Sequence, residues 1–299
     1  MANFPKKVYL NGEISKASDA KISVFDRGFL FGDGIYEVMV RLDSDFFFGA
    51  AHLARLESCL KKVTIEFDIT TLQVEIDRLL KAAELEVKDC LLYIQLTRGV
   101  APRKHSFPKD IAPTVMMYAI PFTLPDVNTQ FVTVVSQSDF RWHRCDIKMT
   151  SLLGNVMAND FAIKKGHYET VFHRDGKMTE GSHSNLFFVK DGVVYTHPAD
   201  EHILKGITRE IVLKICRDTN IPYREEAISF ENTKQMDEAF LTGTSTQIAS
   251  IKQLDEHVYH NGDRSGAITQ KLQDLFLELK RGYTPDMNYE DSSNLLNSL

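Results

Sequence analysis

Lys148 is the residue of this chain best suited to covalent chemistry. It follows a strand-like run at 131–135 and precedes an apolar helical pattern that begins after Ser151. A lysine at such a junction can be held in a pocket, desolvated and used as an amine nucleophile. Because most lysines are solvated surface charges, the position of Lys148 alone leaves both interpretations open.

Two short segments have residues suited to binding an anion. Gly206, Ile207 and Thr208 directly precede a predicted helix, so the amides of Ile207 and Thr208 and the Thr208 hydroxyl are placed as phosphate donors. The alternative is that Thr208 only caps the helix. A second turn, Gly243–Thr246, is also rich in donors through Thr244 and Ser245, but taken by itself it is only a loop.

A glycine-rich segment and a basic loop could select a substrate. The three glycines of 26–37 open a strand rather than a helix, so they do not fit a phosphate cradle and instead predict a tight turn that projects Tyr36. Arg103 and His105 lie two residues apart in an irregular loop, where they could converge on one carboxylate by charge-assisted hydrogen bonds. The alternative for this pair is a solvated loop.

The elements that must position these residues are strands, helices and hairpins without strict βαβ alternation. We therefore expect an α+β fold with two domains. Two prolines near residue 123 interrupt the pattern and mark the boundary. The predicted division is an N-terminal domain at 1–120, a linker at 121–130, a C-terminal domain at 131–281 and a polar tail at 282–299.

Composition limits the class of protein. The chain has 299 residues, 43% of them hydrophobic, and a net charge of −6 without a basic block, which argues against nucleic acid as the main partner. Its apolar runs are strand-sized, so no membrane span is predicted. Four cysteines without a CxxC pair suggest neither a zinc knuckle nor a disulfide framework, and we expect no metal and a cytoplasmic protein.

Several motifs occur in an order that resembles a known family. After Lys148 come Thr179-Glu180-Gly181-Ser182, then Leu204–Arg209, then Gly243–Thr246. Together they resemble the fold-type IV pyridoxal-phosphate enzymes, which include D-amino acid and branched-chain aminotransferases and aminodeoxychorismate lyase. The resemblance spans nearly the whole chain. It implies pyridoxal 5′-phosphate as the cofactor, a Schiff base on Lys148 and the two-domain architecture of that family.

The resemblance also assigns roles to the other cofactor residues. Glu180 would lie beside the pyridine nitrogen and keep it protonated, so that the ring acts as an electron sink. Arg55 would be the phosphate arginine of a histidine-leucine-x-arginine-leucine motif. The remaining implied cofactor contacts are Leu204, Ile207, Thr208, Thr244 and Ser245.

Two departures from the family pattern concern hydrogen bonding near the cofactor. His183 stands where relatives often have serine. Met149-Thr150-Ser151 stands where many have serine-leucine-asparagine.

Within the family, the chain is most like the D-amino acid aminotransferases. Tyr36, Arg103 and His105 match the carboxylate-binding set of that subgroup, whose arginine and histidine reach the neighbouring subunit's site. This implies a homodimer with shared active sites and transamination between a D-amino acid, such as D-alanine or D-glutamate, and a 2-oxo acid.

Other activities remain open on the sequence. The same fold serves aminodeoxychorismate lyase and L-branched-chain aminotransferases, of which the second is disfavoured by Arg103 and His105. An amine transaminase that acts on substrates without a carboxylate is a further alternative. A non-catalytic binding protein that keeps the fold is a different class, and intact Lys148 and Glu180 argue against it.

Overall fold

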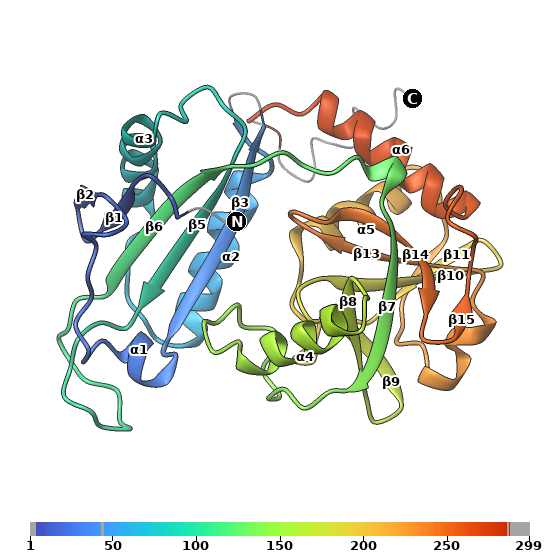
Figure 1. The fold of residues 1–299 in the computed structure, drawn as a ribbon, viewed down its shortest axis with the longest axis horizontal. Coiled ribbons are helices and arrows are strands. Elements are labelled where there is room, and N and C mark those ends of the chain that lie inside the picture. Colours follow the sequence, from blue (N-terminus) through green and yellow to red (C-terminus); the bar gives the residue numbers. More distant parts are fainter. Residues whose placement is uncertain (1–3, 43–44, 286, 288–299) are drawn as a thin grey trace. The chain divides into compact units, whose positions relative to one another are not determined.

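The computed structural model describes residues 4–42, 45–285 and 287, and the chain forms two units (Figure 1). The first unit consists of Met1–Thr123 with Ile147–Ser151, and the second of Leu124–Asp146 with Leu152–Leu299. Each unit has its own sheet and helices, so the predicted α+β fold with two domains is confirmed.

The first unit is built on a six-stranded antiparallel sheet. Its strand order is β2-β1-β6-β5-β3-β4. The strands are β1 (Val8–Leu10), β2 (Glu13–Ser15), β3 (Gly34–Leu42), β4 (Asp45–Phe46), β5 (Cys90–Thr97) and β6 (Thr114–Pro121). β3 pairs with β5 along its whole described length except the last residue, so the residues of β3 have a fixed register.

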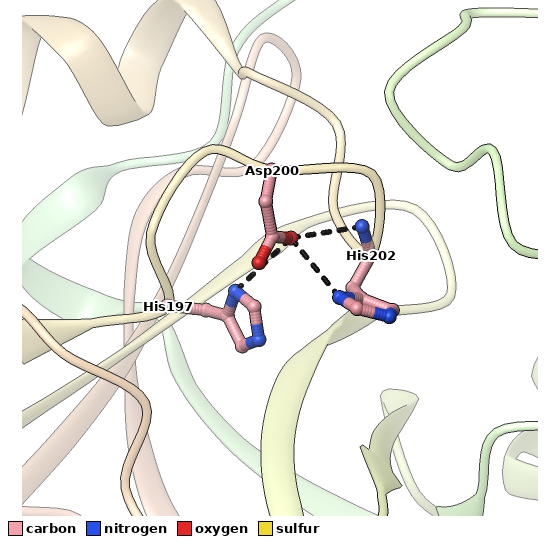
Figure 2. A group of neighbouring side chains, drawn as sticks. All are labelled: His197, Asp200 and His202. Carbon is pink, nitrogen blue, oxygen red and sulfur yellow. Dashed lines mark hydrogen bonds and ion pairs between the residues drawn. The ribbon is translucent and has the colours of Figure 1, made fainter.

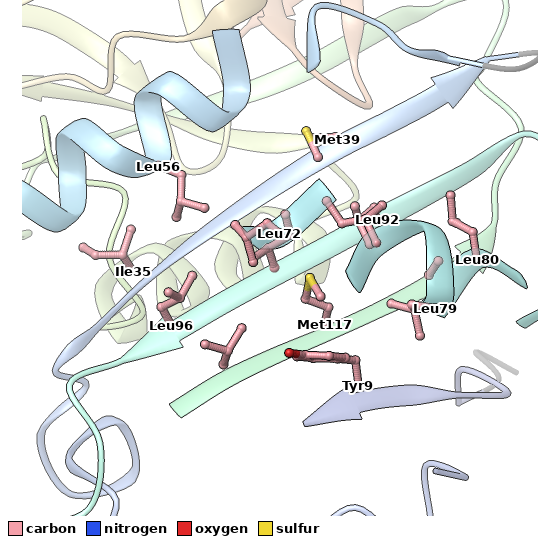
Figure 3. Packing of buried hydrophobic residues seen from close by; sticks show 14 of the residues in the cluster. Tyr9, Ile35, Met39, Leu56, Leu72, Leu79, Leu80, Leu92, Leu96 and Met117 are labelled. Atoms are coloured by element: carbon pink, nitrogen blue, oxygen red, sulfur yellow. The ribbon is translucent and has the colours of Figure 1, made fainter. Parts of the chain in front are cut away.

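Helices cover this sheet and close its core. The unit contains α1 (Arg27–Phe31), α2 (Gly49–Lys62), the 3-10 turn η1 (Ile69–Thr71) and α3 (Leu72–Ala83). Apolar residues of α2 and α3, such as Leu56, Leu72 and Leu79, pack against those of the strands, such as Met39 and Leu92 (Figure 3). Burial of this apolar surface is the main stabilising contribution to the unit.

The second unit is built on a nine-stranded mixed sheet. The strand order is β12-β11-β10-β13-β14-β7-β8-β9, with β15 paired to β14. The strands are β7 (Phe131–Ser138), β8 (Glu169–Arg174), β9 (Lys177–Gly181), β10 (Asn185–Lys190), β11 (Val193–Thr196), β12 (Tyr223–Glu225), β13 (Glu238–Gly243), β14 (Gln247–Leu254) and β15 (His257–Val258). β9 also pairs with β10, through Glu180 and Asn185. That pairing closes six of the strands into a barrel.

Three helices complete the second unit. They are α4 (Leu153–Lys164), α5 (Ile207–Asp218) and α6 (Ala267–Arg281), with 3-10 turns η2 (Val127–Thr129) and η3 (Phe230–Gln235). The core of the barrel strands includes Val134, Val171, Phe188 and Leu241. None of the helices in the described residues is both long and apolar enough to cross a membrane.

Three features differ from the sequence-based expectation. Residues 147–151, assigned to the C-terminal domain, cluster with the first unit, because β3 binds their backbone. The turn expected at 26–34 contains the one-turn helix α1, which begins where the Asp26 carboxylate accepts from the amide of Gly28 at 2.8 Å. Most of the predicted tail at 282–299 lies outside the described residues.

Candidate active site

Lys148 is held against β3 by backbone hydrogen bonds. The amide of Tyr36 donates to the carbonyl of Lys148 at 3.0 Å, and the amide of Thr150 donates to the carbonyl of Gly34 at 2.9 Å. Nζ of Lys148 lies 4.2 Å from the centre of the Tyr36 ring. The structure therefore brings together, within the first unit, the predicted nucleophile and one predicted substrate-binding residue.

The hydroxyls that follow Lys148 bind the turn before β3. Oγ1 of Thr150 donates to the carbonyls of Gly32 and Gly34 at 3.0 and 3.2 Å. Oγ of Ser151 lies 3.0 Å from the Gly32 carbonyl. This departure from the family sequence thus supplies side-chain bonds that join the lysine segment to the turn.

Arg55 is positioned by a buried carboxylate. Its Nε and Nη2 donate to Glu37 at 2.9 and 2.6 Å, and Nδ1 of His52 lies 3.0 Å from the same carboxylate. Burial would raise the pKa of Glu37, but the charges and hydrogen bonds of Arg55 and His52 hold that pKa well below its ordinary range. The carboxylate stays ionised and fixes the direction of Arg55.

Glu37 and His52 were not among the residues singled out from sequence. His52 lies three residues before Arg55 in α2, so both are on one face of the helix. Glu37 directly follows Tyr36 in β3, so the two side chains point to opposite faces of the sheet. The spacing of His52 and Arg55 was therefore a readable signal, whereas the pairing with Glu37 depends on how α2 packs against β3.

Arg103 and His105 lie close together around Phe31. The guanidinium of Arg103 lies 5.0 Å from the centre of the Phe31 ring, and the His105 ring lies 5.8 Å from it. Both side chains are exposed. Among the described residues no hydrogen bond joins either of them to Tyr36, so Arg103 and His105 both contact Phe31 but are not placed on Tyr36.

The loop that carries Arg103 and His105 is anchored by two buried arginines. Nη1 of Arg27 donates to the carbonyl of Lys104 at 2.7 Å, and the guanidinium of Arg98 stacks 3.6 Å from the centre of the Phe107 ring. Asp33 accepts from both arginines, at 2.7 and 2.9 Å. These contacts restrict the loop on both sides of the Arg103 and His105 pair.

In the second unit, Glu180 is a buried carboxylate at the pairing that closes the barrel. It accepts from Nη1 of Arg141 at 2.8 Å, from the amide of Leu204 at 2.9 Å and from Nδ2 of Asn185 at 3.2 Å. Burial raises the pKa of Glu180 to about 7 despite Arg141, whose charge is shared with Asp139. The pKa of Glu180 therefore lies near neutral pH, and a cation placed beside this carboxylate would stabilise its ionised form.

Arg141 was the partner that sequence reasoning missed. It lies in the segment before Lys148, where only the lysine was considered as a functional residue. Asn185 supports Glu180 and also donates to the carbonyl of Leu204 at 2.8 Å.

The start of α5 is an uncapped helix N-terminus. Its N-cap is Gly206, which makes no side-chain cap, so Thr208 is not the N-cap that the simpler interpretation required. Ile207 and Thr208 are buried in the first turn, where amides have no partner within the helix. A Cβ at Gly206 would overlap Oδ1 of Asn185. These features suit a phosphate group.

The remaining predicted cofactor residues lie in the turn between β13 and β14. Thr244 is half-buried and Ser245 is exposed. Thr246, in the same turn, is buried, and its hydroxyl forms a hydrogen bond with the Tyr168 hydroxyl at 3.1 Å.

His183, the second departure from the family, contacts the buried Glu169 through both its backbone amide and its ring, whose Nδ1 lies 3.6 Å from that carboxylate. The amide of His183 donates to the buried Glu169 at 2.6 Å, while the imidazole is largely exposed.

Comparisons of sequence and of fold show which known proteins this chain is similar to. The family model described as amino-transferase class IV matches residues 34–254. D-alanine aminotransferase of Staphylococcus aureus (strain N315) is 38% identical over 274 residues, which cover 91% of this chain and 96% of the relative. D-alanine aminotransferase of Staphylococcus epidermidis (strain ATCC 12228) is 39% identical over 274 residues, which cover 90% and 96%.

The fold is shared with a solved branched-chain amino acid aminotransferase from Escherichia coli. The two structures superpose with a TM-score of 0.85 and cover 95% of this chain and 97% of the other. Because the sequence identity is 24%, this similarity shows the fold alone.

Proposed function

The chain belongs to the class IV aminotransferases, and we propose that it transfers an amino group between a D-amino acid, such as D-alanine, and a 2-oxo acid. The family membership predicted from Lys148, Glu180 and the motifs around them is confirmed. The chain is an aminotransferase, and D-alanine aminotransferases of two Staphylococcus species match nine-tenths of its length.

The cofactor that we propose is pyridoxal 5′-phosphate, which when bound supplies an electron-withdrawing ring that stabilises negative charge on the substrate α-carbon. Three features of this chain fit such a group. Glu180 is a buried carboxyl suited to a ring-nitrogen cation, the uncapped start of α5 suits a phosphate, and Arg55 is a fixed cation. Leu204 donates its amide to Glu180 and so orients that carboxyl.

Lys148 has two proposed roles. Its Nζ holds the cofactor covalently before the substrate amine arrives. Once released, Nζ removes a proton from the substrate α-carbon and delivers a proton to the adjacent reacting carbon, acting first as base and then as acid. The backbone bonds from β3 keep the lysine segment in one place during both steps.

Ile207, Thr208, Thr244 and Ser245 are proposed as phosphate donors together with Arg55. The first two present backbone amides and a hydroxyl at the helix start, and the other two present a donor-rich turn. These roles follow from the family resemblance, and the exposure and geometry of the segments are compatible with them.

The observation that carries the D-amino acid assignment is the anchored pair of Arg103 and His105. Two cationic or donor side chains around one aromatic ring can grip a carboxylate by charge-assisted hydrogen bonds. We propose that this pair, reaching in from the neighbouring subunit of a homodimer, and Tyr36 bind the α-carboxylate of the substrate. An L-branched-chain aminotransferase is the weaker alternative, since the branched-chain enzyme shares only the fold.

We also propose that the enzyme is a cytoplasmic homodimer. Large apolar side chains are exposed on two segments of the first unit that are bonded to each other, 22–29 and 99–107. They include Val24, Phe25, Phe29 and Phe107. Exposed apolar patches of this kind are typical of protein interfaces. Light scattering after size exclusion should give twice the monomer mass of 34.0 kDa, and a monomer would contradict the proposal.

A steady-state assay tests the proposed reaction. Purified enzyme loaded with pyridoxal 5′-phosphate should form more than one equivalent of pyruvate from D-alanine only when 2-oxoglutarate is present. L-leucine should be a poor donor, and Lys148→Ala should have no activity. Pyruvate formed from aminodeoxychorismate without an acceptor would support the lyase instead, and near-normal turnover by Lys148→Ala would contradict the role of the lysine.

A further inference from the structure

Two histidines and an aspartate converge on the loop between β11 and α5. His197, Asp200 and His202 each present one ligand atom, and these three atoms lie within 4.8 Å of one another. Figure 2 shows both imidazole rings turned toward the carboxylate of Asp200. These residues lie outside the set assigned to cofactor and substrate, and their spacing of three and two residues was not singled out from sequence.

The distances fit a tetrahedral metal centre. Nδ1 of His197 lies 3.6 Å from Oδ1 of Asp200, and Nδ1 of His202 lies 3.3 Å from the same oxygen. Ligands bound to zinc at about 2.0 Å in tetrahedral geometry are about 3.3 Å apart. Each histidine nitrogen therefore already lies at about the distance from the carboxylate oxygen that one such ion requires, and all three ligand atoms lie within 4.8 Å of one another.

A third histidine lies beside this group. The ring centre of His143 is 6.1 Å from that of His202, close to the 5.9 Å between His197 and His202. His143 is kept near by a backbone bond between its segment and the loop, in which the amide of Cys145 donates to the carbonyl of Glu201 at 2.8 Å. His143 is exposed, so it can turn toward an ion.

The loop is preorganised without a metal. The amide of His202 donates to Oδ1 of Asp200 at 2.9 Å, and the carbonyl of His197 accepts from the buried Arg209 at 2.8 Å. The charge of Arg209 is compensated by Glu210 and Glu225. Nδ1 of His197 also lies 2.8 Å from the Pro198 carbonyl, and metal binding would replace that hydrogen bond. Asp200 and His202 are half-buried, which leaves a route for an ion from solvent.

We propose that His197, Asp200 and His202 form a binding site for a divalent transition metal of the zinc type, with His143 as its fourth ligand. Imidazole nitrogens select zinc and its neighbours over magnesium and calcium, which prefer oxygen ligands. The site lies on the loop that continues to Leu204, whose amide donates to Glu180, so an ion here stiffens the segment that orients that carboxylate. Metal binding itself does not depend on the proposed reaction.

Calorimetric titration of untagged holoenzyme with zinc chloride, after treatment with a chelator, tests this site. The wild-type protein should bind one zinc ion per chain. His202→Ala should weaken binding by at least ~10-fold, the size of effect seen even for residues that only support metal ligands. Asp200→Asn should weaken it as well, although its amide oxygen can still accept from the amide of His202. His143→Ala should have a smaller effect.

His257→Ala is the matched control, because His257 is half-buried in β15 of the same unit and belongs to no such cluster. It should bind zinc as the wild type does. The proposal is overturned if wild-type protein takes up no zinc, or if His202→Ala and Asp200→Asn bind it as tightly as His257→Ala. Circular dichroism of each variant without zinc shows whether the variant is folded, so that a loss of zinc affinity is distinguished from a loss of fold.

Discussion

Nζ of Lys148 lies 4.2 Å from the centre of the Tyr36 ring, and the carbonyl of Lys148 accepts from the amide of Tyr36 at 3.0 Å. The backbone of Lys148 is therefore fixed against β3, and Lys148 does not lie in a flexible loop. Its segment is bound to β3 and clusters with the first unit, although most of the chain on either side of it belongs to the second. A nucleophile held by backbone bonds loses little freedom when it reacts, which favours catalysis.

Glu37→Gln should destabilise the first unit by about 3 kcal/mol, because it removes the buried negative charge that compensates Arg55. Urea unfolding of the cofactor-free protein measures the change. Glu84→Gln is the control, since it breaks the exposed ion pair with Lys6 and should leave the unfolding midpoint unchanged. Equal midpoints for the two variants would show that the Glu37 and Arg55 pair is not stabilising.

Glu180→Gln should change how stability depends on pH. Burial raises the pKa of Glu180 from 4.5 to about 7, so between these values the folded cofactor-free protein binds a proton that the unfolded chain has released. The stability of the wild type therefore falls as pH rises through this window, and the glutamine variant lacks that contribution.

Thermal midpoints of both cofactor-free proteins at about pH 5 and about pH 8 test this dependence. The thermal midpoint of the variant, relative to that of the wild type, should be higher at about pH 8 than at about pH 5. A difference in midpoint that is the same at both pH values would mean that Glu180 has an ordinary pKa in the folded state.

Gly206→Ala should weaken cofactor binding, because the new Cβ overlaps Oδ1 of Asn185 and displaces its bonds to Glu180 and Leu204. A hydrogen bond to a charged group contributes about 1.5–3 kcal/mol, so the dissociation constant should rise ~10–100-fold. Absorbance titration of cofactor-free protein with pyridoxal 5′-phosphate gives this constant. Gly192→Asn adds a side chain in a turn with open space and should bind pyridoxal 5′-phosphate as the wild type does. If Gly206→Ala bound the cofactor as tightly as Gly192→Asn, the steric argument would be refuted.

Arg103→Met should raise the KM for D-alanine by ~10–100-fold while leaving the cofactor spectrum unchanged, since a charged hydrogen bond to the substrate carboxylate is lost. Lys104→Met is a neighbouring control, because only the backbone carbonyl of Lys104 is used, by Arg27. Steady-state kinetics of both variants distinguish the roles. If both variants had the same KM for D-alanine, Arg103 would not be a substrate-binding residue.

Local turn chemistry made much of the fold predictable. Asp175-Gly176 and Asp191-Gly192 are dipeptides typical of hairpin turns, and both pairs have the positive φ values of tight turns between β8 and β9 and between β10 and β11. Helices α2, α3, α5 and α6 are predictable as well, because each has an apolar face with the helical period. α1 was missed, since a single helical turn shows no period.

Partners brought together by tertiary packing could not be predicted from spacing. Arg141 reaches Glu180 because it follows β7 while Glu180 lies in β9, two strands away in the barrel. Glu37 meets Arg55 because α2 packs on β3. In each case the predicted residue was visible in a motif, but the charge that positions it lies elsewhere in the sequence.

The most direct test of the account is the visible absorbance of the purified holoenzyme before and after adding D-alanine, without any 2-oxo acid. The visible absorbance of the bound cofactor should bleach with D-alanine and persist with L-leucine, because one half of the reaction proceeds without an acceptor. Bleaching by L-leucine alone would contradict the D-amino acid assignment. A protein that acquires no visible absorbance from pyridoxal 5′-phosphate would contradict the cofactor and the role of Lys148 together.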